Sequence, residues 1–118
     1  MKKYNYKVGR LGENMAVNYL LRHKYNILDR NFYCNQGEID IIAEKEKYII
    51  FIEVKTRTTQ KYGKPVEAVN NIKQKHIYQS AKYYLYKNNK LNRFIRFDVI
   101  EIVIKNYKTY INHIKQIM

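Results

Sequence analysis

The strongest strand signal in the chain is Ile49-Ile50-Phe51-Ile52-Glu53-Val54-Lys55, and Gly37-Glu38-Ile39-Asp40-Ile41-Ile42 comes shortly before it. Both stretches are rich in β-branched residues, which favours the strand conformation. Each also places acids among apolar residues, where a charge is costly and usually serves a function. We therefore predict two adjacent strands, at residues 38–43 and 48–56, that bring carboxylates together.

The two predicted strands form a hairpin whose polar side chains share one face. Side chains alternate along a strand, so the odd-numbered residues of 51–57 face one way, and the even-numbered residues of 50–56 form a core face. A hairpin centred near Glu46 and Lys47, in the polar stretch 44–47, places Asp40 opposite Glu53. This stretch contains no glycine, which predicts a loop longer than a tight two-residue turn.

Helical periodicity predicts two helices. The first runs from residue 9 to about 25. The second opens at Pro65, because proline is tolerated in the first turn of a helix. We expect a break near residues 70–71 before this helix continues to about residue 87. The residues predicted to face the sheet are Glu13, Ala16, Val17, Leu20 and Leu21 in the first helix, and Ile77, Ala81, Tyr84 and Leu85 in the second.

Further strands are predicted on both sides of the hairpin and the second helix. Residues 27–33 form a first strand, and residues 94–104 and 107–117 form two closing strands. The chain length suits a single domain, residues 1–118. The predicted fold class is α/β, with a mixed central sheet of four or five strands flanked by helices.

The composition points to nucleic acid as the partner. The chain has 118 residues and a formal net charge of +13, which attracts polyanions. No basic amphipathic helix with an apolar face stands out, so nucleic acid is favoured over an anionic membrane. The longest apolar run, residues 48–52, is too short to span a bilayer. The single cysteine, Cys34, excludes an intramolecular disulfide, and we expect a reduced, cytoplasmic protein.

The acids of the hairpin have the chemistry of a metal site. Two carboxylates directly opposite each other repel unless a cation lies between them, and oxygen ligands select Mg²⁺ or Mn²⁺. Glu13 lies on the buried face of the first helix, where an acid is awkward unless it reaches these carboxylates. The predicted metal ligands are Glu13, Asp40, Glu53 and the backbone carbonyl of Val54.

A bound metal ion at this position predicts phosphodiester hydrolysis. Lys55 would orient the attacking water or offset charge in the transition state. The predicted catalytic residues are Glu13, Asp40, Glu53 and Lys55. Contacts to the nucleic-acid backbone are predicted for Arg57, Lys61, Lys64, Lys73 and Lys75.

Other readings of these acids remain open. A salt-bridged, solvent-exposed hairpin face would have the same alternation of charges. Asp98, in the first closing strand, is predicted to be structural and paired with Arg96.

The Asp40…Glu53-Val54-Lys55 arrangement resembles the PD-(D/E)xK nuclease superfamily. More closely, the chain resembles a small bacterial family known as UPF0102, or YraN-like proteins. The stretches that carry this resemblance are residues 9–16, 37–43, 51–57 and 63–69, with Lys73, Lys75, Ala81, Tyr84 and Leu85 in the second helix and residues 96–99 in a later strand. The resemblance implies a restriction-endonuclease-like core.

The chain is also similar to archaeal Holliday-junction resolvases, with acids at corresponding places. This similarity implies a Mg²⁺- or Mn²⁺-dependent endonuclease that acts on DNA in preference to RNA, branched DNA included, and it raises the prospect of a homodimer. The alternative is a catalytically silent nucleic-acid-binding module that keeps the fold and the positive surface, and serves DNA or RNA processing without cutting.

Overall fold

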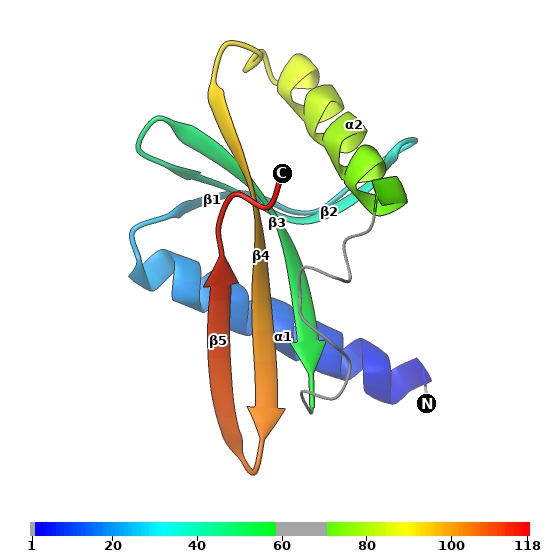
Figure 1. Cartoon of the computed structure of the whole chain (residues 1–118), viewed down its shortest axis with the longest axis vertical. Helices are drawn as coiled ribbons and strands as arrows, with labels where there is room; N and C mark the ends of the chain where they lie inside the picture. Colours follow the sequence, from blue (N-terminus) through cyan, green and yellow to red (C-terminus); the bar gives the residue numbers. More distant parts are fainter. Residues whose placement is uncertain (1, 59–70) are drawn as a thin grey trace.

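A five-stranded sheet forms the centre of the computed structural model, which describes residues 2–58 and 71–118, with side chains from residue 8 onward (Figure 1). The strands lie in chain order, and each neighbouring pair is antiparallel except β3 and β4, which are parallel. Their bounds are β1 Asn26–Cys34, β2 Gly37–Lys45, β3 Tyr48–Arg57, β4 Phe94–Lys105 and β5 Lys108–Ile114. The predicted α/β class with a mixed sheet is confirmed, and it is compatible with a restriction-endonuclease-like core.

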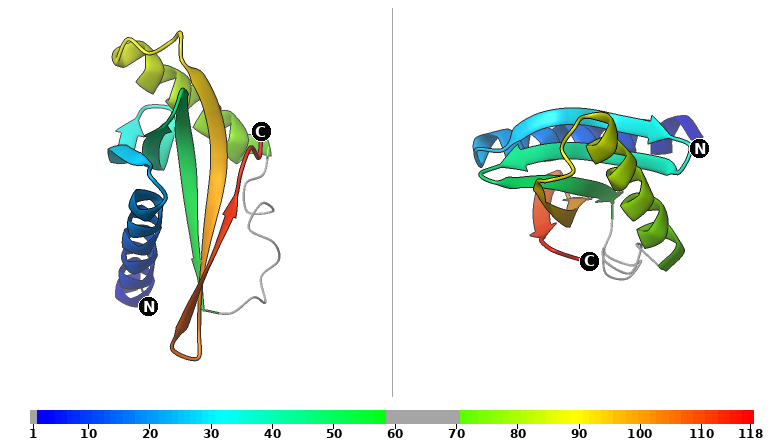
Figure 2. Two further views of the ribbon diagram at one scale, coloured as in Figure 1. Left: turned by 90° about the vertical axis from the view of Figure 1, so that its left-hand side faces the viewer. Right: turned by 90° about the horizontal axis from the view of Figure 1, so that it is seen from above.

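Two helices cover opposite faces of this sheet (Figure 2). Ala16 of α1 (Lys2–Arg22) packs in one core cluster with Ile50 and Ile52, whereas Ile77 of α2 (Asn71–Lys87) packs in another with Phe51. Because side chains alternate along β3, successive residues of this strand serve the two cores in turn. The α2 face of β3 is therefore apolar as far as Phe51, and it becomes polar only at Glu53.

The first helix meets the sheet along a narrow row of small and apolar residues. Gly12, Ala16 and Leu20, at four-residue steps, are all buried. A Cβ atom at Gly12 would collide with the side chain of Thr56, so α1 approaches β3 more closely there than a larger residue would allow. The predicted burial of Leu21 is wrong, because this side chain points away from the row and is 51% exposed. The helix also begins earlier and ends earlier than predicted, at Lys2 and Arg22.

The β2–β3 hairpin has the predicted register but a tighter turn. Its pairs run from Ile41 opposite Ile52 to Lys45 opposite Tyr48, which leaves a connection of two residues. The prediction of a longer loop is wrong. Glu46 adopts a left-handed backbone with φ of 55°, and strand pairing outweighs the cost of this conformation for a residue other than glycine. The same register makes Asp40 and Glu53 neighbours one position beyond the last pair.

The second helix buries the predicted stripe of Ile77, Ala81, Tyr84 and Leu85. Its predicted start at Pro65 lies outside the described residues, where nothing tests it. The two closing strands are confirmed, although β5 ends at Ile114 rather than at residue 117. Neither α1 nor α2 contains an apolar stretch long enough to cross a membrane.

Candidate functional site

Asp40 lies just beyond the last β2–β3 pair, where its side chain replaces a backbone acceptor. Its Oδ2 accepts a hydrogen bond of 2.8 Å from the backbone N–H of Val54. Burial, followed by repulsion from Glu53, raises the pKa of Asp40 to about 7, against the opposing effect of the Val54 hydrogen bond. Glu13 and Glu38 add smaller repulsions. Asp40 is thus a half-buried acid that the fold makes difficult to ionise.

Glu53 lies at the point where the α2 face of β3 changes from apolar to polar. Its side chain is only 12% exposed, and its Oε1 lies 3.0 Å from Nζ of Lys73 on α2. Lys73 is thus a cation that a different element, α2, places beside Glu53. The predicted meeting of Asp40 and Glu53 is therefore present, and a charge that balances it comes from α2.

Lys55 lies on the same face of β3, two residues after Glu53. Burial lowers the pKa of Lys55, and the positive charge of Lys73 lowers it further. Burial also lowers the pKa of Lys73, but the charge of Glu53 and hydrogen bonds to Glu53 and Lys55 outweigh this effect and raise it. Two carboxylates and two ammonium groups thus share one half-buried cluster.

Glu13 is turned toward β1 rather than into this cluster. Its Oε1 accepts hydrogen bonds from Arg30 Nη2 at 3.0 Å and from Asn31 Nδ2 at 3.0 Å. The side chain is 13% exposed, and its charge still contributes to the raised pKa of Asp40. The third predicted ligand therefore lies near enough to act electrostatically, while its own hydrogen bonds go to Arg30 and Asn31.

Asp40 and Glu53 fit a hard divalent cation bound through carboxylate oxygens. Their mutual repulsion is the kind that such an ion relieves, and the ammonium group of Lys73 now supplies positive charge at Glu53. Among the side chains of residues 8–58 and 71–118, however, no three His, Cys, Asp or Glu groups lie close enough together to hold a metal ion. A third carboxylate ligand would require Glu13 to leave Arg30.

The residues predicted to contact phosphates lie in different settings. Arg57 is buried beside Glu101, with Nε 3.3 Å from Oε2 and only 9% of its side chain exposed. Lys73 pairs with Glu53, whereas Lys75 is exposed on α2. Lys61 and Lys64 lie outside the described residues. Phosphate contacts at all five positions stay predictions, and the buried ion pair with Glu101 disfavours Arg57.

A hollow of about 390 Å³ opens beside the acids, between α2 and the start of β2. We call it the acid-site hollow, and its lining residues are Glu38, Glu53, Ile72, Lys73, His76 and Ile77. A ligand in this hollow would contact Glu53 and Lys73 from the α2 side, whereas Asp40 does not line the hollow.

The structure identifies two supports of the site that the sequence reasoning missed. Gly12 allows α1 to approach Thr56, and this places the next residue, Glu13, beside β1. Arg30 and Asn31 then hold Glu13 through hydrogen bonds. A glycine directly before an acid in a helix is a weak sequence signal for a functional site. Only the packing of α1 against Thr56 shows why position 12 cannot carry a side chain.

Comparison with known proteins gives a consistent result. A family model described as "Uncharacterised protein family UPF0102" matches residues 12–102. A UPF0102 protein from Clostridium tetani is 53% identical over 108 residues, covering 91% of this chain and 88% of the relative. One from Caldicellulosiruptor bescii is 51% identical, covering 92% and 94%. One from Geobacter metallireducens is 47% identical, covering 97% and 93%.

Proposed function

The chain belongs to the uncharacterised protein family UPF0102, and we propose that it is a divalent-metal-dependent nuclease that hydrolyses phosphodiester bonds in DNA. The observation that supports this proposal best is the pair formed by Asp40 and Glu53. Burial and like charge make the pair costly, since they raise the pKa of Asp40 to about 7. Acids held in such a state beside an accessible hollow are typical of catalytic sites.

The proposal assigns a role to each residue of the cluster. Asp40 and Glu53, with Glu13 and the Val54 carbonyl, would hold Mg²⁺ or Mn²⁺, which when bound polarises the phosphate and lowers the pKa of water. Lys55 would position the attacking water or offset charge that develops on the phosphate. Its lowered pKa suits a group that exchanges a proton during the reaction.

The charge of the protein supports a polyanionic substrate. The formal net charge is +13, and exposed Lys75 lies on the helix that borders the acid-site hollow. We propose DNA, branched DNA included, as the substrate and the cytoplasm as the location. A two-fold dimer would suit a symmetric junction. Affinity should fall steeply with salt, because phosphate contacts release counterions.

A second candidate function is a nucleic-acid-binding module without catalysis. The observation that favours it is that lysine and arginine already neutralise two of the acids, through the Glu53–Lys73 and Glu13–Arg30 pairs. In such a module these pairs would hold β3 to α2 and β1 to α1, and the positive surface would bind nucleic acid.

A cleavage assay separates the two functions. Labelled single strand, duplex, flap, four-way junction and structured RNA are incubated with Mn²⁺ and wild type, Glu53→Gln or Glu38→Gln. Glu38 is the matched control, because it is an exposed acid that lines the same hollow. The nuclease proposal expects cleavage by wild type and Glu38→Gln but not by Glu53→Gln.

Metal binding supplies a readout that does not depend on turnover. A ligand that binds only the folded state raises the unfolding temperature, so Mn²⁺ should stabilise wild type and Glu38→Gln and leave Glu53→Gln unchanged. If all three proteins bind DNA, none cuts it and Mn²⁺ stabilises none of them, the binding-module function replaces the nuclease.

A further inference from the structure

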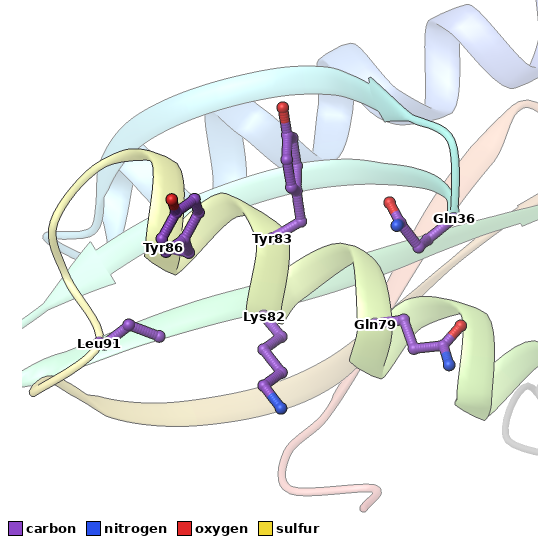
Figure 3. A pocket seen from close by; sticks show the side chains of 6 residues that line it. All are labelled: Gln36, Gln79, Lys82, Tyr83, Tyr86 and Leu91. Carbon is purple, nitrogen blue, oxygen red and sulfur yellow. The ribbon is translucent and has the colours of Figure 1, made fainter.

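A second hollow, of about 480 Å³, lies away from the acids (Figure 3). We call it the tyrosine pocket, and its lining residues are Gln36, Gln79, Lys82, Tyr83, Tyr86 and Leu91. Figure 3 shows the two tyrosines rising from one side of α2, with Gln36 extending from the β1–β2 turn. Tyr86 is 68% exposed and Tyr83 is 39% exposed, so part of each ring is accessible to a ligand.

The chemistry of this pocket suits a nucleobase. Tyrosine rings offer flat faces on which bases stack. The side-chain amides of Gln36 and Gln79 form no hydrogen bond with another described residue, and an amide can pair with a base edge through its donor and acceptor. Lys82 at the rim, and Lys87, whose Nζ lies 6.0 Å from the Tyr83 ring centre, supply positive charge for a phosphate.

An exposed stripe along α2 connects this pocket to the acid-site hollow. Its members follow steps of four, three, four and three residues, so they share one side of the helix. They are Ile72, His76, Gln79, Tyr83 and Tyr86, and all are exposed. Ile72 and His76 line the acid-site hollow, and the other three line the tyrosine pocket.

A hydrogen bond anchors the β1–β2 turn beside the stripe, and two lysines give the stripe positive charge. His76 donates from Nδ1 to the carbonyl oxygen of Gln36 at 2.8 Å, which fixes the β1–β2 turn beside α2 between the two hollows. Lys75 and Lys82, seven residues apart, lie on the same side of the helix next to the stripe, and both are exposed. A rise of about 1.5 Å per residue puts Tyr86 about 20 Å from Lys73.

We propose that this stripe binds an unpaired DNA strand that leaves the acid-site hollow, with one base stacked in the tyrosine pocket. The inference rests on the proposed function for the position of the cut, but not for the binding itself. It names the substrate class as DNA with a single-stranded segment next to the scissile phosphate, such as a flap, an overhang or an opened junction.

The test compares two substrates of the same duplex sequence, one blunt and one with a single-stranded overhang. Binding is measured by fluorescence anisotropy in the presence of a chelator, so no cleavage is required. Tyr86→Leu should weaken binding of the overhang substrate by about fivefold or more, the loss expected when one stacked base is removed. Binding of the blunt duplex should stay unchanged.

Tyr78→Leu is the matched control, because Tyr78 is 50% exposed on the same helix but does not line the pocket. It should leave both affinities unchanged. A fluorescent base analogue placed at successive overhang positions should be quenched at one position in wild type and lose that quenching in Tyr86→Leu.

Three results would overturn the inference: equal losses for the two substrates, equal losses in the two variants, or no loss in either. Competition by a free mononucleotide as strong as that by the overhang would also overturn it, since the pocket would then bind small nucleotides rather than a strand. Because binding is measured without metal, a Tyr86-dependent preference in a protein that cuts nothing would support the inference and contradict the nuclease.

Discussion

Asp98 on β4 and the Asp40–Glu53 pair on β2 and β3 lie in one sheet, and their charges have opposite environments. Asp98 on β4 lies beside Ile52 of β3, and Glu53 follows directly. The Asp98 side chain, fully buried, accepts hydrogen bonds from Arg96, from His113 Nε2 at 2.7 Å and from the backbone N–H of Gln116 at 3.1 Å. Its interactions connect β4 to β5 and to the C-terminal segment.

The pKa shifts of the two sites have opposite signs. Burial raises the pKa of Asp98, but hydrogen bonds from His113 and Arg96 outweigh burial and hold it below its ordinary value. Asp40 has one backbone donor and an acidic neighbour, so burial and Glu53 raise its pKa to about 7. The fold satisfies the charge of Asp98 and leaves that of Asp40 poorly compensated. Asp98 thus has the partners of a structural acid, whereas Asp40, the proposed metal ligand, has a single backbone donor.

The largest expected effect is on stability, at the satisfied acid. Asp98→Ala removes the partner of buried Arg96 and His113, and leaving a buried charge unpaired costs about 3–5 kcal/mol. Urea unfolding at neutral pH measures this loss. Asp98→Asn keeps an acceptor for the Gln116 N–H and should lose less. If Asp98→Ala cost less than about 1 kcal/mol, the Asp98 network would not be structural.

The next effect concerns the close approach of α1 to Thr56 of β3. Gly12→Ala would force a Cβ into the Thr56 side chain, and overpacking of this kind costs about 1–3 kcal/mol. Gly9→Ala is the control, because a Cβ there meets no atom within 4 Å, and alanine is the better helix former by about 1 kcal/mol. Equal unfolding midpoints for the two variants would show that the approach at Gly12 can relax freely.

A third prediction uses the poorly satisfied acid. A carboxyl group whose folded pKa is above its unfolded value stabilises the fold fully only below the unfolded pKa, here 3.8, and loses this contribution as the pH rises through about 7. Asp40→Asn cannot ionise, and it retains an oxygen for the Val54 N–H. It should therefore be more stable than wild type at high pH by roughly 1–4 kcal/mol, since each pKa unit corresponds to about 1.4 kcal/mol.

The pH dependence is the sharper part of this prediction. The advantage of Asp40→Asn should be absent below the unfolded pKa of 3.8, partial at about pH 5, where only the unfolded state is ionised, and complete by about pH 8. Urea unfolding at both pH values, with a chelator present, measures the difference. The same gain in the free energy of unfolding at both pH values would mean that ionisation of Asp40 does not destabilise the fold.

The smallest effect on stability is expected at the cation that balances Glu53. The Lys73 side chain is 36% exposed, so Lys73→Gln should cost less than about 1 kcal/mol. Removing its charge also removes one cause of the lowered pKa of Lys55. If the acids bind metal, Mn²⁺ should bind more tightly to this variant in a calorimetric titration, because Glu53 is released. Weaker Mn²⁺ binding would indicate that Lys73 supports the site rather than competing for it.

Local patterns predicted much of the fold and part of the site. Alternation in β3 identified the face that carries Glu53 and Lys55, and helical spacing identified the buried stripe of α2 from Ile77 to Leu85. The position of Asp98 predicted its pairing with Arg96, which is two residues away on the same strand face. Each of these follows from a period of about two or 3.6 residues.

The sequence by itself determined the order of elements, the hairpin register and the meeting of Asp40 with Glu53, because all three depend on residues close together in the chain. For three acids other than Asp98, tertiary structure alone decided the neutralising cation: Lys73 for Glu53, Arg30 for Glu13, and Arg57 for Glu101. These partners come from separate elements, and long charged side chains pair with whichever group the packing of helices on the sheet brings within reach.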